Sequence, residues 1–457
     1  MLEKYEPRKQ KGHEFFWYYG NGHGKIKAPW WSGMDALFGP LTLYAAYELT
    51  GIEKYRDIAL ASAKLAIEPP SGGGVLWREK NGCWISEYAW NGMEFKDEFF
   101  VLNGHLWGLQ ALQMLAVATG DSSLQEAYAC ANKGTKVRKY DFFNKSKTWP
   151  WYMLNVKTIN SVHYLLLEMA QFRAMHALTG EFFYKEEAEA RASIFRHTYP
   201  LQLVQRSNGL SVVFSMIGPP HPYWTDTYPV TLECKVNGEA LSARQARHYS
   251  SDPLDQRFFV ELKVPSSPSI CSVTVHPGQD VLVYSQNDFL RVTPSNHKIP
   301  LNDLALGMDA QSVAENGVAI VPAHENQPGI EHYTNNEARI GLPVPSKIAE
   351  GHILALIIKP ERDVNIGFLL QDMEGRHSHR YYPKLIAGKD NIVLLNRLGF
   401  DGNDSLGNEL KMLFLRVYTE KTQPSFFVDI KSFEVLENSA DLQDFFARHR
   451  QSYFHQE

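Results

Sequence analysis

The sequence predicts an α + β multidomain protein, in which helical hairpins that form an α/α toroid are followed by two β-sandwich domains. Three apolar helical stripes end in Thr-Gly before residue 200, and a period-two pattern of apolar residues replaces them afterwards. Nine of the ten tryptophans lie at or before Trp151, which also sets the first third apart. The expected domains are the toroid (1–200), an immunoglobulin-like sandwich (201–280), a jelly-roll-like sandwich (281–440) and a helical tail (441–457).

Three helix pairs are expected in the first domain. The first helix of each pair ends at Gly51, Gly120 or Gly180, because glycine readily takes the left-handed conformation that ends a helix. The partner helices are expected near 54–65, 123–139 and 181–196. Long loops between the pairs hold most of the tryptophans, and a ring of hairpins gathers such loops at one end. We therefore expect a cleft there.

Alternating apolar residues predict strands in the remaining chain. Segments of the first sandwich include 211–216, 230–236 and 272–275, separated by Gly, Pro and Asn turns. Segments of the second sandwich include 281–284, 353–358, 365–370, 391–395, 412–418 and 426–430, a spacing that favours a jelly roll.

The charge balance excludes general affinity for polyanions. There are 46 Lys and Arg residues against 51 Asp and Glu residues, a formal charge of −5, with no block of like charge, so we expect no nucleic-acid partner. The first ten residues carry charges where an export signal needs an apolar run, and no stretch reaches the roughly 18 apolar residues of a membrane span. A cytoplasmic location is the expectation.

The four cysteines form no Cys-x-x-C pair and have no histidine at metal-ligand spacing. We expect neither a metal site nor a disulfide framework, and interpret the cysteines as free, mostly buried thiols. A bond between Cys234 and Cys271 across the sandwich is the alternative. No cofactor is expected, because no phosphate-binding glycine loop is present.

A β-hairpin is predicted between the first two helix pairs. Residues 75–79, a turn at 80–82 and residues 83–88 read as strand, Asn-Gly turn and strand. This hairpin would project Glu87 and Tyr88 over the mouth of the toroid. The pattern alone favours an ordinary strand with one wet and one packed face. Farther on, Asn103 is expected to cap the next helix.

These segments resemble the C-terminal α/α domain of heparan and heparosan D-glucuronyl C5-epimerases. The resemblance depends on Trp30-Trp-Ser-Gly-Met-Asp35, on Glu87-Tyr88 after a tryptophan-bearing strand, on Phe100-Val-Leu-Asn-Gly104, and on the helix of His163. It covers about residues 15–200, and the remaining 257 residues gain nothing from it.

The resemblance implies that carbon 5 of D-glucuronate units in a polysaccharide is inverted to give L-iduronate. This reaction needs a base for the proton beside the carboxylate and an acid on the opposite ring face. The family's Glu-Tyr pair corresponds to Glu87 and Tyr88, and Tyr152 is the best-placed further tyrosine. We expect Glu87 as base and Tyr88 or Tyr152 as acid. Candidates to neutralise the substrate carboxylate are Arg78, Lys157 and His163, although a surface arginine and a core histidine are alternatives.

Indole rings can stack on the apolar faces of sugars, but buried tryptophans are also ordinary core residues. We predict that loop tryptophans line the cleft and that Trp107 packs between helices. Besides Arg78 and His163, the predicted substrate-binding residues are five tryptophans and two polar residues near the start of the helix after the hairpin: Trp31, Trp84, Trp90, Trp149, Trp151, Asn103 and His105.

One feature departs from the resemblance. The animal enzymes place β domains before the helical domain and draw catalytic tyrosines from them, whereas here the β domains follow. Tyr18, Tyr19 and His23 are candidates to replace that contribution.

The expected partner is a uronate-containing, heparosan-like capsular or exopolysaccharide, with a homodimer as one assembly. A polysaccharide lyase, which shares the first proton abstraction, and a non-catalytic polysaccharide-binding protein are the alternative functions.

Overall fold

The structure is a computed structural model that describes residues 18–22, 24–217, 226–249, 259–275, 280–295, 318–321, 329–332, 337–345, 347–418 and 427–454. The chain divides into two compact units. The first holds the described residues up to Asn144 together with 150–160 and 167–191, and the second holds 145–149, 161–166 and the described residues from Ala192 onward.

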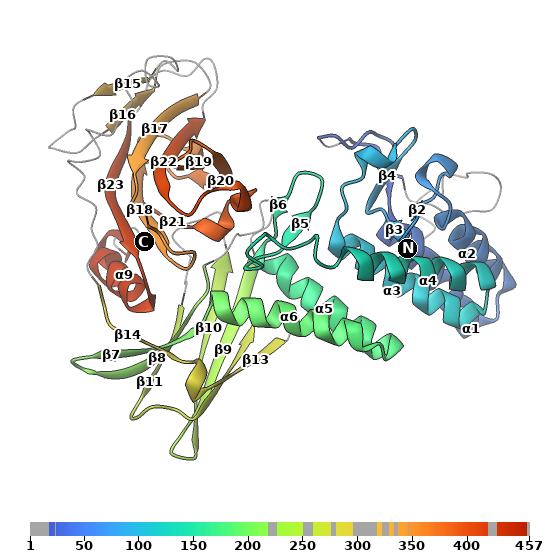
Figure 1. Cartoon of the computed structure of the whole chain (residues 1–457), viewed down its shortest axis with the longest axis horizontal. Helices are drawn as coiled ribbons and strands as arrows, with labels where there is room; N and C mark the ends of the chain where they lie inside the picture. The colour runs from blue at the N-terminus through green and yellow to red at the C-terminus, as the bar shows by residue number, and fades with distance from the viewer. Residues whose placement is uncertain are drawn as a thin grey trace. The chain divides into compact units, whose positions relative to one another are not determined.

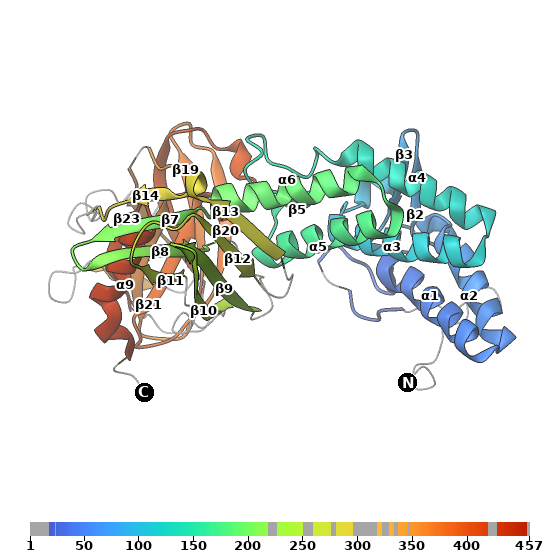
Figure 2. The ribbon, with the colours of Figure 1, turned by 90° about the horizontal axis from the view of Figure 1, so that it is seen from below.

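Helix pairs form the first unit, as predicted. Helix α1 packs against α2 and α3, and α3 packs against α4 (Figures 1 and 2). Gly51 and Gly120 end α1 and α3 with φ values of 69° and 65°, and Gly180 has a φ of 72°, which confirms the predicted ends. Closure into a toroid stays a prediction. The helices are α1 (Gly33–Thr50), α2 (Glu53–Ala66), α3 (Leu102–Thr119), α4 (Ser122–Arg138), α5 (Val162–Thr179) and α6 (Phe182–Thr198).

Three two-stranded sheets connect these helices: β1 (Trp30–Ser32) with β4 (Tyr88–Trp90), β2 (Leu76–Glu79) with β3 (Gly82–Ile85), and β5 (Trp151–Met153) with β6 (Thr158–Ile159). The β2–β3 pair is the predicted hairpin, with Leu76 opposite Ile85. It packs against α4, where a β-carbon on Gly82 would lie 2.4 Å from the Gly134 nitrogen. The hairpin is therefore part of the packed body and does not project from it.

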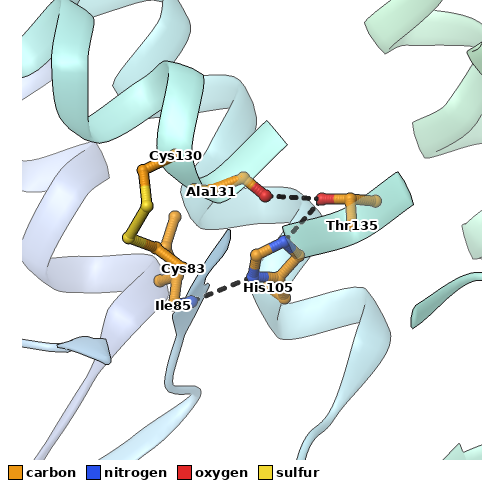
Figure 3. The surroundings of a disulfide bond; sticks show 6 residues. All are labelled: Cys83, Ile85, His105, Cys130, Ala131 and Thr135. Carbon is orange, nitrogen blue, oxygen red and sulfur yellow. Dashed lines mark hydrogen bonds between the residues drawn. A yellow bond between two sulfur atoms is a disulfide. The ribbon is translucent and has the colours of Figure 1, made fainter. Parts of the chain in front are cut away.

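All four cysteines form disulfides, which corrects the prediction of free thiols. Cys83 on β3 is bonded to Cys130 on α4, beside His105 (Figure 3). Cys234 is bonded to Cys271, its neighbour on the adjacent strand of the same sheet, not across the sandwich. The bonded cysteines are 47 and 37 residues apart in the sequence, so no local pattern indicates that they pair. The fold brings them together. Disulfides persist in oxidising environments, whereas free thiols are typical of a reducing one.

Strands of the first β region form two four-stranded sheets, ordered β10-β9-β12-β13 and β11-β8-β7-β14. We predicted that residues 281–284 begin the second sandwich, but β13 pairs with β12 and belongs to the first. The strands are β7 (Leu201–Arg206), β8 (Gly209–Ser215), β9 (Asp226–Val236), β10 (Glu239–Tyr249), β11 (Phe259–Val264), β12 (Ile270–Val275), β13 (Asp280–Ser285) and β14 (Leu290–Val292).

The second β region has sheets ordered β15-β16-β23-β18-β21 and β17-β22-β19-β20. Apolar residues of both sheets, among them Leu356, Phe368 and Leu413, share one core, so the two sheets form a sandwich. The strands are β15 (Val318–Val321), β16 (Gly329–His332), β17 (Glu337–Pro343), β18 (Ile353–Pro360), β19 (Val364–Asp372), β20 (His377–Leu385), β21 (Asn391–Asn396), β22 (Leu410–Tyr418) and β23 (Phe427–Leu436).

The predicted terminal helix is present as α9 (Ser439–Phe454) (Figure 1). Its Leu442 and Phe445 are buried with Ile217 and Ile353, and Arg206 of β7 pairs with Asp444. This helix thus joins the two β regions of the second unit. Within the described ranges, no helix is both long and apolar enough to cross a membrane.

Candidate active site

Glu87 occupies a slot between the first turns of two helices. Its carbonyl oxygen accepts a hydrogen bond from the Gly33 amide of α1 at 3.2 Å. On the other side, a β-carbon on Gly104 of α3 would lie 2.2 Å from Glu87 Oε2 and 2.6 Å from Glu87 Cβ. A β-carbon on Gly33 would lie 2.2 Å from the Ser86 carbonyl oxygen. The slot exists because both helices carry glycine where the Ser86–Glu87 segment passes.

Few polar contacts offset the burial of the Glu87 carboxyl group. It is 5% exposed, and Oε2 has no hydrogen-bond partner in the described part of the chain. The pKa of Glu87 is raised to about 7: burial is the main cause, a hydrogen bond with Tyr88 acts to lower it, and the negative charge of Glu98 acts to raise it. The first turns of α1 and α3 also favour its charged form, since helix N-termini carry partial positive charge. Glu87 is therefore a carboxyl group able to exchange a proton near neutral pH.

Two tyrosines complete the group. Tyr88 follows Glu87 directly and lies on β4, and Tyr152 comes from β5, 64 residues later. Their hydroxyl oxygens are 3.5 Å apart. Both side chains are half-buried, so part of each meets solvent. The structure thus brings together the three residues that we predicted to be catalytic, with two hydroxyls and one carboxyl available for proton transfer.

Aromatic rings border this group. Trp30 meets Tyr88 edge to face with ring centroids 5.4 Å apart, and Tyr19 stacks on Trp30 at 4.1 Å. The Tyr19 hydroxyl donates to Asp35 in the first turn of α1. Tyr19 therefore contributes to the surroundings of the site through Trp30, whereas His23 lies outside the described residues.

The sequence analysis missed Glu98. This residue is 2% exposed; its Oε2 accepts from Trp77 Nε1 at 2.7 Å and from the Ser86 hydroxyl, and its Oε1 accepts from the Phe100 amide at 2.9 Å. Burial raises the pKa of Glu98, although these hydrogen bonds act to lower it. Two acidic residues precede Phe99 in the sequence, and no local pattern marks the second as buried.

A third buried carboxylate, Glu168, has the cationic partner that Glu87 lacks among the described residues. Glu168 is fully buried, but Oε2 pairs with Arg191 Nε at 3.0 Å and Oε1 accepts from Asn160 at 2.9 Å. Arg191 also pairs with Glu187 at 2.9 Å. No ion pair joins Glu87 to a cation among the residues that the structure describes. The contrast favours a structural role for Glu168 and a chemical one for Glu87.

The predicted cleft tryptophans are core residues in the structure. Trp31, Trp84, Trp149 and Trp151 are 0% exposed and Trp90 is 2% exposed. Trp31 donates to the Gly74 carbonyl at 2.9 Å, and Trp84 stacks on His105 at 3.8 Å. The loops that carry these indoles fold inward and bury them, so they are not available to stack on a sugar in this structure. A position in a loop does not by itself show whether a tryptophan lines a cleft or packs in the core.

His105 and Asn103 also differ from their predicted roles. His105 Nδ1 accepts from the Ile85 amide at 3.0 Å, so the ring hydrogen resides on Nε2, which lies 2.8 Å from the Thr135 hydroxyl (Figure 3). Burial lowers the pKa of His105 to about 3, so the ring is a neutral core group. The residue before α3 is Val101, and Asn103 lies inside the helix without capping it, although it is buried.

Four other candidates differ from Glu87 in exposure or in the compact unit to which they belong. Arg78 is exposed, and its strand neighbour Trp77 points to Glu98, so Arg78 faces the other way. Lys157 is exposed. His163 and Trp149 belong to the second compact unit. As for metals, no group of three His, Cys, Asp or Glu residues in the described ranges could hold an ion.

The sequence of this region has a recognised family. Residues 9–193 match the family model of the D-glucuronyl C5-epimerase C-terminus. This match confirms the resemblance predicted from the motifs, and it includes Glu87, Tyr88, Tyr152 and the missed Glu98. It supports a carbohydrate epimerase function or a carbohydrate-binding one. No curated protein matches the chain at a significant level.

Solved structures give weaker similarities. The cellobiose 2-epimerase of Spirochaeta thermophila DSM 6192 is 12% identical over 41% of this chain and 48% of its own, with a TM-score of 0.30. A D-mannose isomerase is 12% identical over 41% and 46%, also at 0.30. A carbohydrate-binding module of the β-sandwich superfamily is 12% identical over 50% and 92%, at 0.22. The chain spans less than half the length of the first two, and these TM-scores decide neither fold nor function.

Proposed function

We propose that this protein inverts carbon 5 of D-glucuronate units in a heparosan-like capsular or exopolysaccharide, giving L-iduronate. The single observation that carries the proposal is Glu87: a nearly buried carboxyl without a cationic partner among the described residues, beside the Tyr88–Tyr152 hydroxyl pair. The family match over residues 9–193 supports the choice of reaction.

Glu87 is the base in this proposal. A pKa of about 7 leaves the carboxylate substantially ionised at neutral pH, yet makes it a stronger base than an ordinary glutamate. The hydrogen on carbon 5 is acidified by the adjacent substrate carboxylate, and its removal leaves an enolate-like anion. The close-fitting slot keeps water away from the charged base, which strengthens its attraction for that hydrogen.

The tyrosine pair is the acid. A tyrosine hydroxyl with an ordinary pKa near 10 is protonated at neutral pH, so it can donate without any shift. A hydroxyl that returns its proton to carbon 5 from the ring face opposite Glu87 completes the inversion. The 3.5 Å contact between Tyr88 and Tyr152 lets one hydroxyl stabilise the charge that develops on the other. The reaction uses no metal or cofactor in this proposal.

A uronate lyase shares the first proton abstraction and then expels the glycosidic oxygen. Incubation with heparosan in deuterated water separates the two activities. An epimerase leaves deuterium on carbon 5 of intact chains and forms iduronate, as we expect here. Shortened chains with ultraviolet-absorbing ends would establish the lyase instead, and binding without exchange would establish a polysaccharide-binding protein. A homodimer and a cytoplasmic location stay predictions.

A further inference from the structure

We propose that Glu98 is the positioning residue of Glu87: it binds the chain on either side of Glu87, at Ser86 and at Phe100, and places a second carboxylate beside the base. The inference deepens the proposed function and rests on it for the identity of the reaction. The interaction between the Glu98 and Glu87 carboxyl groups can be measured without any substrate.

The hydrogen bonds of Glu98 reach both sides of the slot. Through Oε2 it binds the Ser86 hydroxyl, immediately before Glu87 in the chain. Through Oε1 it binds the Phe100 amide at 2.9 Å, in the turn that leads into α3 and its Gly104. Phe100 has a φ of 54°, a conformation that non-glycine residues rarely adopt, so the hydrogen bond holds an uncommon turn. One carboxylate thus sets the spacing between the strand side and the helix side of Glu87.

Ser86 is held on all sides. Its amide donates to the Val75 carbonyl at 2.8 Å, and its carbonyl oxygen lies against Gly33. Its hydroxyl has one hydrogen and lies within hydrogen-bond reach of two acceptors, Glu98 Oε2 and the Tyr88 carbonyl oxygen, the latter at 2.8 Å. These contacts hold the Ser86 backbone, and with it the position of Glu87, and the bond to Glu98 is one of them.

The groups around the Glu98 oxygens favour the charged form. Burial raises the pKa of Glu98, whereas the donors Trp77 Nε1, the Phe100 amide and the Ser86 hydroxyl act to lower it, because such bonds favour the carboxylate. A charged Glu98 disfavours a second negative charge on Glu87, and this effect contributes to the raised pKa of Glu87. The titratable groups on the elements packed around Glu87 are Asp35 of α1, Tyr88, Glu98, His105 of α3 and Tyr152 of β5.

The test compares the Glu87 pKa in the full-length chain and in two matched variants. Glu98→Gln removes the charge beside the base with almost no change in shape. Glu94→Gln removes the same charge from an exposed residue four positions earlier. Carbon-13 NMR of labelled glutamate carboxyl groups follows the titration, and the Glu87 signal is identified by its loss in Glu87→Gln.

We expect the Glu87 pKa to fall in Glu98→Gln and to stay in place in Glu94→Gln. In activity assays, the rise of kcat/KM with pH should move to lower pH only in Glu98→Gln. An unmoved Glu87 titration in folded Glu98→Gln overturns the proposal. If the unmodified protein proves inactive on every uronate polymer, the proposed function fails while the NMR result still decides this inference.

A second variant covers the case in which Glu98→Gln does not fold. Ser86→Ala removes the anchor before Glu87 but keeps the charge of Glu98. We expect kcat to fall at least tenfold while the pH limb remains in place, and the Glu87 titration to remain raised. A Ser86→Ala protein with unchanged kcat contradicts the positioning role.

Discussion

The Glu87 carboxyl group fits against the α-carbon of Gly104, where a β-carbon would lie 2.2 Å from Oε2 and 2.7 Å from Cδ. This contact places a buried acid at the first turn of α3, between two helix starts. Most of the expected behaviour of the site follows from the close fit and from the burial that it imposes.

Gly104→Ala is expected to expel Glu87 from its slot. The new methyl group would collide with the Cβ and carboxyl of Glu87, and overpacking of this kind costs about 1–3 kcal/mol. Denaturant unfolding measures the loss of stability. Met114→Ala, at an exposed position on the same helix, should change the free energy of unfolding by less than about 0.5 kcal/mol. Equal stability of Gly104→Ala and the parent protein would show that the slot is not tight.

Stability should fall as pH rises through the Glu87 titration. The folded-state pKa of about 7 is raised above the ordinary value of 4.5, so between these values the folded protein holds a proton that the unfolded chain has released. Linkage then predicts a loss of about 3 kcal/mol from about pH 4.5 to about pH 7. Glu87→Gln removes this loss, so its stability relative to the parent should increase from about pH 5 to about pH 8. A difference that is constant with pH, as expected for Glu94→Gln, would contradict the raised pKa.

Both disulfides should be detectable chemically. The denatured, unreduced protein should show no reactive thiol, and the reduced protein should show four. Replacing both Cys83 and Cys130 by alanine opens a loop spanning 47 positions, and the chain-entropy model gives a destabilisation of about 4 kcal/mol. Four reactive thiols in the denatured, unreduced protein would contradict both disulfides and support the free thiols predicted from the sequence.

Tyr88→Phe and Tyr152→Phe should each lower kcat by about 10² to 10⁴. Because the two hydroxyls act as a pair at 3.5 Å, the double variant should lose little more than the worse single variant. Tyr140→Phe, at an exposed position, is the control. Losses that multiply in the double variant would show that the hydroxyls act independently.

The sequence predicted the local elements of the first unit well. Gly51, Gly120 and Gly180 mark helix ends because a left-handed residue is needed there, and the Asn81-Gly82 turn marks the hairpin. These signals are local, so the chain alone contains them. The juxtaposition of Glu87, Tyr88 and Tyr152 came from the family resemblance, since no spacing rule brings residues 64 positions apart together.

The errors have one physical origin, which is contact over long sequence distance. Trp84 and Trp151 lie in segments that resemble exposed loops, but the fold buries them completely. Cys83 and Cys130 pair because β3 packs on α4, a contact that spacing does not encode. Glu98 resembles its neighbour Asp97 in sequence, and only the donors of Trp77, Ser86 and Phe100 distinguish it.

The central claim is that Glu87 removes the hydrogen from carbon 5. The most direct test is the rate at which deuterium from the solvent enters carbon 5 of heparosan, compared between the parent protein and Glu87→Gln. The account predicts that Glu87→Gln remains folded, binds the polymer and exchanges at least about 100-fold more slowly. Exchange by Glu87→Gln at the parental rate would contradict it.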